Sequence, residues 1–362
     1  IINFNLEVSV LGHLSSAIQF GFIIGTLIFA IFTIADKFSP SKVFFISAVF
    51  AALFNLAITI GNQTLYSLIV IRFLVGFFLA GIYPVGMKIA SDYFKEGLGK
   101  SLGFLVGALV LGTAFPHLLN SFQGLISWKS IVYITSLISL FGGLIILVFV
   151  SDGPYKKALK QFDISIFYKV FKVKNFRTAA FGYFGHMWEL YAFWAFVPVI
   201  LLGYSNLHPE VNLNIPVLSF IIIGSGSLAC VISGYMSQLF GVKKTATVAL
   251  ALSCICCLVA PILFMVKLEL VFVAFMVFWG MVVIADSPLF STLVAQNTNS
   301  ESKGTALTIV NSIGFAVTIV SIQFFNILVD VIEIKYLLLV LALGPILGLI
   351  ALNNNIKEQG YG

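Results

Sequence analysis

The chain has 362 residues, of which 60% are hydrophobic and 9% are charged, and its mean hydropathy is +1.08. An ordinary globular domain carries about 25% charged residues, so this composition excludes a soluble enzyme, a disordered chain and a nucleic-acid-binding protein. The net charge of +6 is typical of membrane proteins whose Lys and Arg gather on cytoplasmic loops. The four cysteines lie in apolar stretches, which indicates packing or lipid-facing residues rather than disulfides or a metal site.

Apolar stretches follow one another along the whole chain, each close to the roughly 20 residues with which a helix crosses a bilayer. They cover residues 14–33, 43–60, 65–87, 98–119, 131–150, 178–202, 216–238, 245–266, 268–291, 304–328 and 334–352. The pattern predicts an all-α membrane protein with eleven spanning helices in this sequence.

The positions of Lys and Arg predict how these helices are oriented. One set of alternate loops, together with the C-terminal tail, holds Lys37, Lys42, Lys88, Lys95, Lys100, Lys156, Lys157, Lys160, Lys169, Lys172, Lys174, Arg177, Lys243, Lys244, Lys303 and Lys357. The opposite loops hold only Lys129, Lys267 and Lys335. Because basic residues resist translocation, the first set and the C-terminus are expected in the cytoplasm.

The longest polar stretch, residues 151–176, separates an N-terminal transmembrane half, residues 1–150, from a C-terminal half, residues 177–352. This stretch mixes Lys with apolar residues at helical spacing, which predicts a cytoplasmic linker that forms an amphipathic helix on the membrane surface. Residues 353–362 are expected to form a cytoplasmic tail.

The two halves repeat with an offset of about two hundred residues, a pattern found in transporters. The offset aligns Pro84 with Pro288 and Asp36 with Gln238. It places the counterpart of residues 178–202 before Ile1, so we expect a parent chain of twelve helices.

Two loops at corresponding positions carry degraded copies of one motif. The residues that fit it are Asp36, Lys37 and Lys42 in the first copy, and Gly234, Gly241, Lys243 and Lys244 in the second, where Gln238 replaces the acid. The stretch 65–87 adds Arg72, four residues before Gly76. Together these features resemble the major facilitator superfamily (MFS). The resemblance implies two pseudo-symmetric six-helix halves, with this chain beginning at the second helix.

The resemblance also implies roles in gating. At a cytoplasmic helix end, Asp36 can accept hydrogen bonds and pair with a base, so it is interpreted as a conformational latch together with the basic residues of both loops. A solvated loop carboxylate is the alternative. Pro84 and Pro288 are expected to loosen two helices that line the central cavity.

Arg72 lies inside an apolar stretch, where a guanidinium costs a few kcal/mol unless it faces a polar cavity or a buried acceptor. The family pattern makes it a candidate for the substrate cavity. Because it is only about seven residues from the outer end of its span, snorkelling to the interface is the alternative.

The most informative stretch is GYFGHMWELYAFWAFVP, in which His186 and Glu189 are three residues apart and therefore share a helix face. Both lie near the middle of a span, as does Asp286. A carboxyl group with a nearby His can relay protons, so these three residues are the predicted proton-coupling site. A structural hydrogen bond between His186 and Glu189 is the alternative.

Aromatic residues of the same stretch, Tyr183, Tyr191 and Trp194, are candidate substrate contacts, with plain packing as the alternative. The sequence thus predicts a secondary transporter that moves a small organic solute by alternating access with proton coupling. We expect a monomer in a bacterial inner membrane that requires no cofactor and no nucleic-acid partner. A transporter-like receptor without turnover is the alternative, whereas an enzyme would need a catalytic motif that we do not find.

Overall fold

The computed structural model describes residues 10–32, 34–94, 97–122, 127–155, 165–298 and 303–353, and every regular element in this part is an α-helix. The helices are α1 (Val10–Ile31), α2 (Ile34–Lys37), α3 (Pro40–Ala57), α4 (Leu65–Leu79), α5 (Tyr83–Tyr93), α6 (Leu98–Asn120), α7 (Trp128–Phe149), α8 (Ser165–Lys172), α9 (Lys174–Leu207), α10 (Ile215–Phe240), α11 (Val242–Phe264), α12 (Glu269–Ala285), α13 (Ser287–Gln296), α14 (Lys303–Leu328), α15 (Ile334–Leu341) and α16 (Leu343–Asn353).

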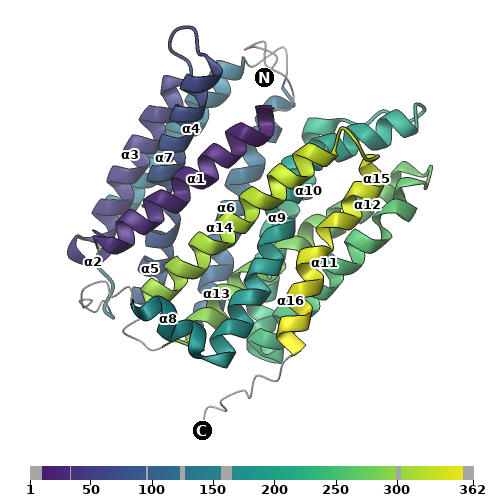
Figure 1. The fold of residues 1–362 in the computed structure, drawn as a ribbon. Helices are drawn as coiled ribbons and strands as arrows, with labels where there is room; N and C mark the ends of the chain where they lie inside the picture. Colours follow the sequence, from purple (N-terminus) through teal and green to yellow (C-terminus); the bar gives the residue numbers. More distant parts are fainter. Residues whose placement is uncertain are drawn as a thin grey trace.

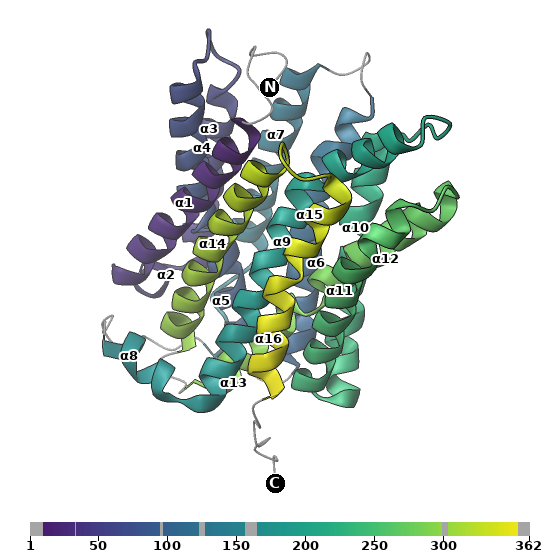
Figure 2. The same cartoon turned by 45° about the vertical axis from the view of Figure 1, so that its right-hand side comes forward.

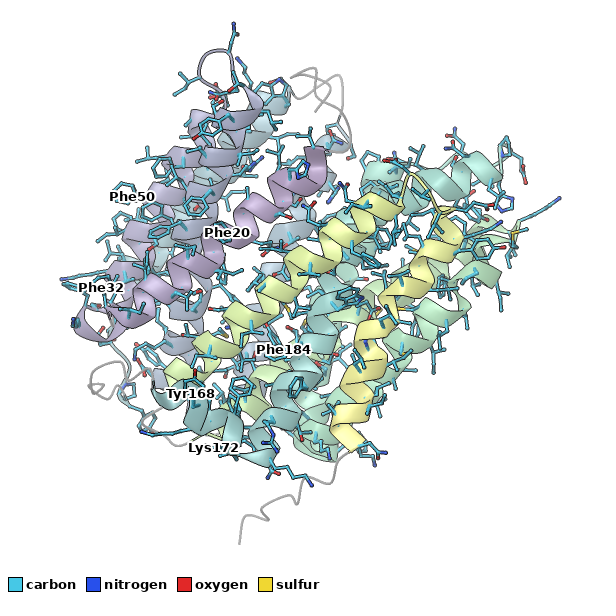
Figure 3. The ribbon with its side chains drawn as sticks, in the orientation of Figure 1. Phe20, Phe32, Phe50, Tyr168, Lys172 and Phe184 are labelled. Carbon is cyan, nitrogen blue, oxygen red and sulfur yellow. The ribbon has the colours of Figure 1, made fainter. Side chains whose placement is uncertain are left out.

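Within the described residues, 11 segments are long and apolar enough to cross a membrane, which confirms the predicted number of spans. Large apolar side chains such as Phe20 and Phe50 lie on the outside of the bundle (Figure 3), where they are 53% and 41% exposed. A soluble protein rarely exposes so many large apolar residues, but lipid tails solvate them. The chain is therefore a multi-pass membrane protein.

The helices form two groups that follow the two halves of the sequence (Figure 1). Helices α1, α3, α4 and α7 lie together on one side, and α9, α11, α12, α15 and α16 lie on the other. The halves meet mainly through two helix pairs, α6 with α10 and α1 with α14. In the view of Figure 2, α14 lies between α1 and α9, so it connects the two groups.

Small residues allow the paired helices to approach closely. A Cβ atom added to Gly103 of α6 would lie 2.7 Å from the carbonyl oxygen of Cys230 in α10, which is too short for any side chain. At the α1–α4 contact, a Cβ on Gly76 would lie 2.0 Å from the carbonyl oxygen of Ile18. Gly76, which the sequence linked with Arg72, is therefore required for helix packing.

Two spans are interrupted at equivalent positions, and in each a proline follows the break. The span Leu65–Ala90 changes from α4 to α5 just before Pro84, and the span Glu269–Gln296 changes from α12 to α13 just before Pro288. Proline has no N–H and fits the first turn of a helix but not its interior. The expected bends are thus present as breaks, and their role in gating stays a prediction.

Part of the linker forms the predicted helix, α8, whereas residues 156–164 lie outside the described residues. Val170 is 8% exposed and packs in the same hydrophobic cluster as Phe176, and the rings of Phe171 and Phe176 meet edge to face with centroids 5.2 Å apart. At least part of the apolar face of α8 is therefore covered by protein rather than by lipid.

Candidate functional site

Helix α9 passes through both large hydrophobic clusters and presents two different faces at mid-span. One face carries His186 and Glu189 toward α11, α12 and α13. The other carries Tyr183 and Tyr191 toward α14, where they meet Gly314 and Phe315. The centre of the C-terminal half therefore holds titratable groups on one side of α9 and aromatic groups on the other.

His186 is paired with Asp286, both side chains being only 1% exposed. The Nδ1 atom of His186 lies 2.8 Å from Oδ1 of Asp286. The contact is short enough for a hydrogen bond, whereas Nε2 of His186 has no hydrogen-bond partner among the described residues. The pair links α9 to the break between α12 and α13.

Asp286 occupies the break between α12 and α13, where it ends one helix and precedes the other. The N-terminus of a helix favours negative charge because its first N–H groups point toward it. The same position is the C-terminal end of α12, where the last carbonyl groups disfavour negative charge, and the side chain of Asp286 makes no capping hydrogen bond to α13. A change in the angle between α12 and α13 would move this carboxylate relative to His186.

Glu189 is held separately by donors from two other helices. Its Oε1 atom accepts hydrogen bonds from Oγ of Ser253 at 2.5 Å and Nε1 of Trp279 at 2.7 Å, and it is 3.2 Å from Sγ of Cys257. The expected direct pair with His186 is therefore replaced by two neighbouring polar sites. The residues share a broad face of α9, but one turn of separation directs them to different helices.

Other buried polar atoms near α9 lack partners. Nε1 of Trp194 and Nδ2 of Asn311 are both buried without a hydrogen bond. Asn311 lies one turn before Phe315 on α14, and Phe315 packs on Tyr191 with ring centroids 5.4 Å apart. Two unused donors therefore border the aromatic face of α9.

The three aromatic residues that the sequence suggested as substrate contacts lie on or beside that face. Tyr191 meets Trp194 edge to face with centroids 5.3 Å apart, and the ring of Tyr183 lies 5.9 Å from that of His186. Tyr83 of α5 packs against the same hydrophobic cluster as Tyr183 and Tyr191. A residue of the N-terminal half thus completes an aromatic group between the halves, one that the sequence did not single out.

Arg72 lies apart from this centre. Its Nη1 atom donates to Oδ1 of Asn55 at 3.5 Å, and the amide of Asn55 donates in turn to Ser136 at 3.0 Å. The guanidinium therefore belongs to a polar network that joins α4, α3 and α7. Asn55 is half-buried, and the role of Arg72 in the substrate cavity stays a prediction.

The two motif-bearing loops lie at the same end of the bundle. Asp36 is in the short helix α2, but its side chain lies outside the described part of the chain. Lys37 and Lys42 are exposed. In the second copy, the Nε2 atom of Gln238 lies 3.4 Å from the position of a Cβ added to Gly97, at the start of α6. This loop therefore contacts the opposite half.

Sequence reasoning missed several residues that surround the titratable groups. Cys257 was interpreted as a packing or lipid-facing residue, but its thiol contacts Glu189. Ser253, one turn before it on α11, and Trp279 were not considered. Ser253 and Cys257 are four residues apart, a spacing that places both on one helix face, and this is the one sequence signal that could have indicated them.

Comparisons with known proteins agree with the fold described above. The family model described as Major Facilitator Superfamily matches residues 2–322. The solved structure of the human organic anion transporter MFSD10 (TETRAN) is similar to the chain with a TM-score of 0.76 at 12% identity, and the match covers 95% of this chain and 83% of that chain. No curated protein sequence matches. At this identity the structural likeness shows the fold alone.

Proposed function

Because the chain belongs to the Major Facilitator Superfamily of membrane transporters, we propose that it moves a small organic solute by alternating access and that transport is coupled to protons. The observation that carries the coupling is the buried contact between His186 and Asp286 at a break in a membrane span. Glu189, in its separate site, is the third member of the proposed proton-coupling group.

The proton balance of the pair supports exchange during a conformational change. With one proton, His186 and Asp286 carry no net charge, either as imidazolium with carboxylate or as neutral imidazole with a carboxyl group. A second proton leaves a charge of +1, and loss of the first leaves −1. Either charge is costly away from water, so exchange is favoured when the site opens to solvent.

The breaks beside Pro84 and Pro288 offer a way to connect proton exchange with the opening of the site to solvent. A span made of two helices can change the angle between them with less disruption of backbone hydrogen bonds than a continuous helix. Movement of α13 against α12 would alter the distance between Asp286 and His186. Protonation of the pair would then bias the equilibrium between inward and outward states.

The unused donors of Trp194 and Asn311 support a solute that carries hydrogen-bond acceptors. A buried donor without a partner costs about 1 to 3 kcal/mol, and a ligand oxygen would satisfy it. The structurally similar MFSD10 is named as an organic anion transporter. We therefore propose organic anions as the first class to test, with binding between α9, α14 and the tyrosine of α5.

The test starts with a thermal-shift screen of organic anions, amines and sugars, because a ligand that binds the native state raises its apparent stability. A solute that raises the thermal midpoint is then tested in proteoliposomes, where its uptake and the internal pH are measured together. Wild-type protein should couple uptake or exchange of the solute to proton movement. Asp286→Asn should abolish proton movement, while Glu210→Gln, the same change at a carboxylate that is 58% exposed, should leave it intact.

Two results would contradict the proposal in different ways. Saturable binding without flux in either direction would identify a transporter-like receptor. Flux with an unchanged proton-to-solute ratio in Asp286→Asn, His186→Gln and Glu189→Gln would show a transporter that does not use these groups for coupling.

A further inference from the structure

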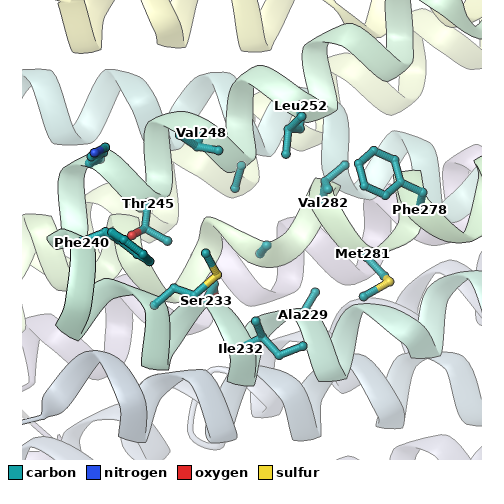
Figure 4. Close-up of a pocket in the computed structure, with 14 residues that line it drawn as sticks. Ala229, Ile232, Ser233, Phe240, Thr245, Val248, Leu252, Phe278, Met281 and Val282 are labelled. Carbon is teal, nitrogen blue, oxygen red and sulfur yellow. The ribbon is translucent and has the colours of Figure 1, made fainter.

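The outer surface of the C-terminal half contains a hollow that none of the predicted proton-coupling or substrate residues lines. It measures about 280 Å³ and lies between α10, α11 and α12 (Figure 4). Its wall is apolar and includes Ile232, Val248 and Phe278, which are 50%, 51% and 45% exposed on the surface of the bundle. Its floor is formed by the small residues Ala229, Ala249 and Ala285, which pack together.

One end of this hollow is basic. Lys244, in the first turn of α11, lines it and also lines a second hollow of about 630 Å³ between α11 and α16, to which Lys243 contributes. Lys243 is half-buried and Lys244 is exposed. In the part of the chain that the structure describes, neither lysine forms an ion pair with a carboxylate.

We propose that this surface binds one anionic phospholipid, with an acyl chain in the hollow between α10, α11 and α12 and the phosphate between Lys243 and Lys244. The apolar wall matches a lipid tail, which has no hydrogen-bonding groups. The lysines lie at the end of a membrane span, where anionic headgroups concentrate and where each lysine attracts them. Along α11, the lysines are therefore followed by the apolar wall, in the order in which a phospholipid carries its charged headgroup and its acyl chain.

The arrangement of Lys244 fits this occupant better than a soluble solute. Its ammonium group lies 6.0 Å from the centre of the Phe240 ring, at the rim where the hollow meets the helix ends. An acyl chain reaches such a hollow directly from the bilayer, whereas a water-soluble anion would leave the apolar wall unused. The site is separate from the proposed proton-coupling and substrate sites and does not rest on them, although it uses Lys243 and Lys244 of the predicted conformational latch.

Native mass spectrometry of the full chain released from detergent micelles tests the proposal. The probes are phosphatidylglycerol and phosphatidylcholine with identical acyl chains. We expect wild-type protein to retain one phosphatidylglycerol in preference to phosphatidylcholine. In Lys243→Gln/Lys244→Gln, affinity for phosphatidylglycerol should fall about 25-fold, from a roughly fivefold loss for each lysine, while affinity for phosphatidylcholine stays the same.

Two further variants separate the contributions of the tail and the headgroup. Ala249→Leu narrows the floor of the hollow and should lower the affinity for both lipids equally. The thermal midpoint of this variant shows whether the fold is kept. Lys129→Gln removes a lysine from the start of α7, at the opposite end of the bundle by the sequence pattern, and should change neither affinity.

Three outcomes would overturn the proposal. The first is equal retention of both lipids by wild-type protein, which would indicate ordinary annular lipid. The second is an unchanged preference for phosphatidylglycerol in the double lysine variant. The third is a dimer that retains no lipid, which would mean that a second copy of the chain covers this surface.

Discussion

Glu189 shows how a single buried carboxylate depends on its neighbours. Its Oε1 atom receives three donors from α11 and α12, and the side chain is only 1% exposed. Because the donors converge on one oxygen, this oxygen acts only as an acceptor. Glu189 therefore connects α9 to α11 and α12.

Replacing Trp279 by Phe should destabilise the protein. The change keeps an aromatic ring but removes the indole N–H that donates to Glu189, and loss of a hydrogen bond to a charged or buried acceptor costs about 1 to 3 kcal/mol. Thermal unfolding in detergent measures the effect. Trp188→Phe is the control, because the Trp188 indole donates to the carbonyl oxygen of Val340 instead, and pH dependence of the loss should appear only for Trp279→Phe.

Asn55 should matter more for stability than for transport. Its amide contacts Arg72, Ser136 and Thr135, so Asn55→Ala leaves the guanidinium of Arg72 without its described acceptor. We expect a loss of about 1 to 3 kcal/mol in thermal unfolding and unchanged solute affinity. A large loss of affinity with unchanged stability would instead favour the substrate role of Arg72.

At the scale of the elements, the broken spans and the glycine contacts have opposite mechanical consequences. The breaks at Pro84 and Pro288 divide two spans into shorter helices, and tilting of these helices is part of the proposed function. The close contact at Gly103 keeps α6 and α10 together. The fold thus combines joints within spans with tight contacts between the halves.

Gly103→Leu should separate the halves locally. A side chain there meets the carbonyl oxygen of Cys230 at 2.7 Å, and backbone cannot yield as a side-chain tip can. Overpacking of this kind costs about 1 to 3 kcal/mol. Gly112→Leu on the same helix is a matched control, since nothing lies within 4 Å of its added Cβ; equal effects on the thermal midpoint would contradict the packing argument.

Pro288→Ala should slow transport more than it weakens binding. Alanine restores the N–H and favours a continuous helix through the break, so Asp286 would lose freedom to move against His186. Solute affinity from the thermal shift should change little, while turnover in proteoliposomes should fall at least about tenfold, which corresponds to 1.4 kcal/mol in the barrier. Normal turnover in this variant would exclude the break as a joint.

For the whole molecule, the distribution of basic residues predicts which end faces the cytoplasm. Glu210 lies in the loop between α9 and α10, and Lys172 lies at the end of α8. The four native cysteines are buried, so introduced cysteines can be labelled against a low background. In intact cells, an impermeant maleimide should label Glu210→Cys but not Lys172→Cys; the reverse pattern would invert the topology.

The sequence by itself determined the number of spans, the division into halves and the positions of the breaks. These features depend on local chemistry: apolar length fixes what can cross a bilayer, and proline fixes where a helix can begin. The Gly76 position was also visible, although only the contact with Ile18 explains why no larger residue fits.

The tertiary structure alone decided which groups meet inside the membrane. The spacing of His186 and Glu189 defines a face of α9 but not the helices packed against it. Asp286 lies 100 residues from His186, and the donors to Glu189 lie 64 to 90 residues away. Those partners depend on how helices pack within the C-terminal half, because side-chain pairing across a bundle is set by helix rotation and depth rather than by order along the chain.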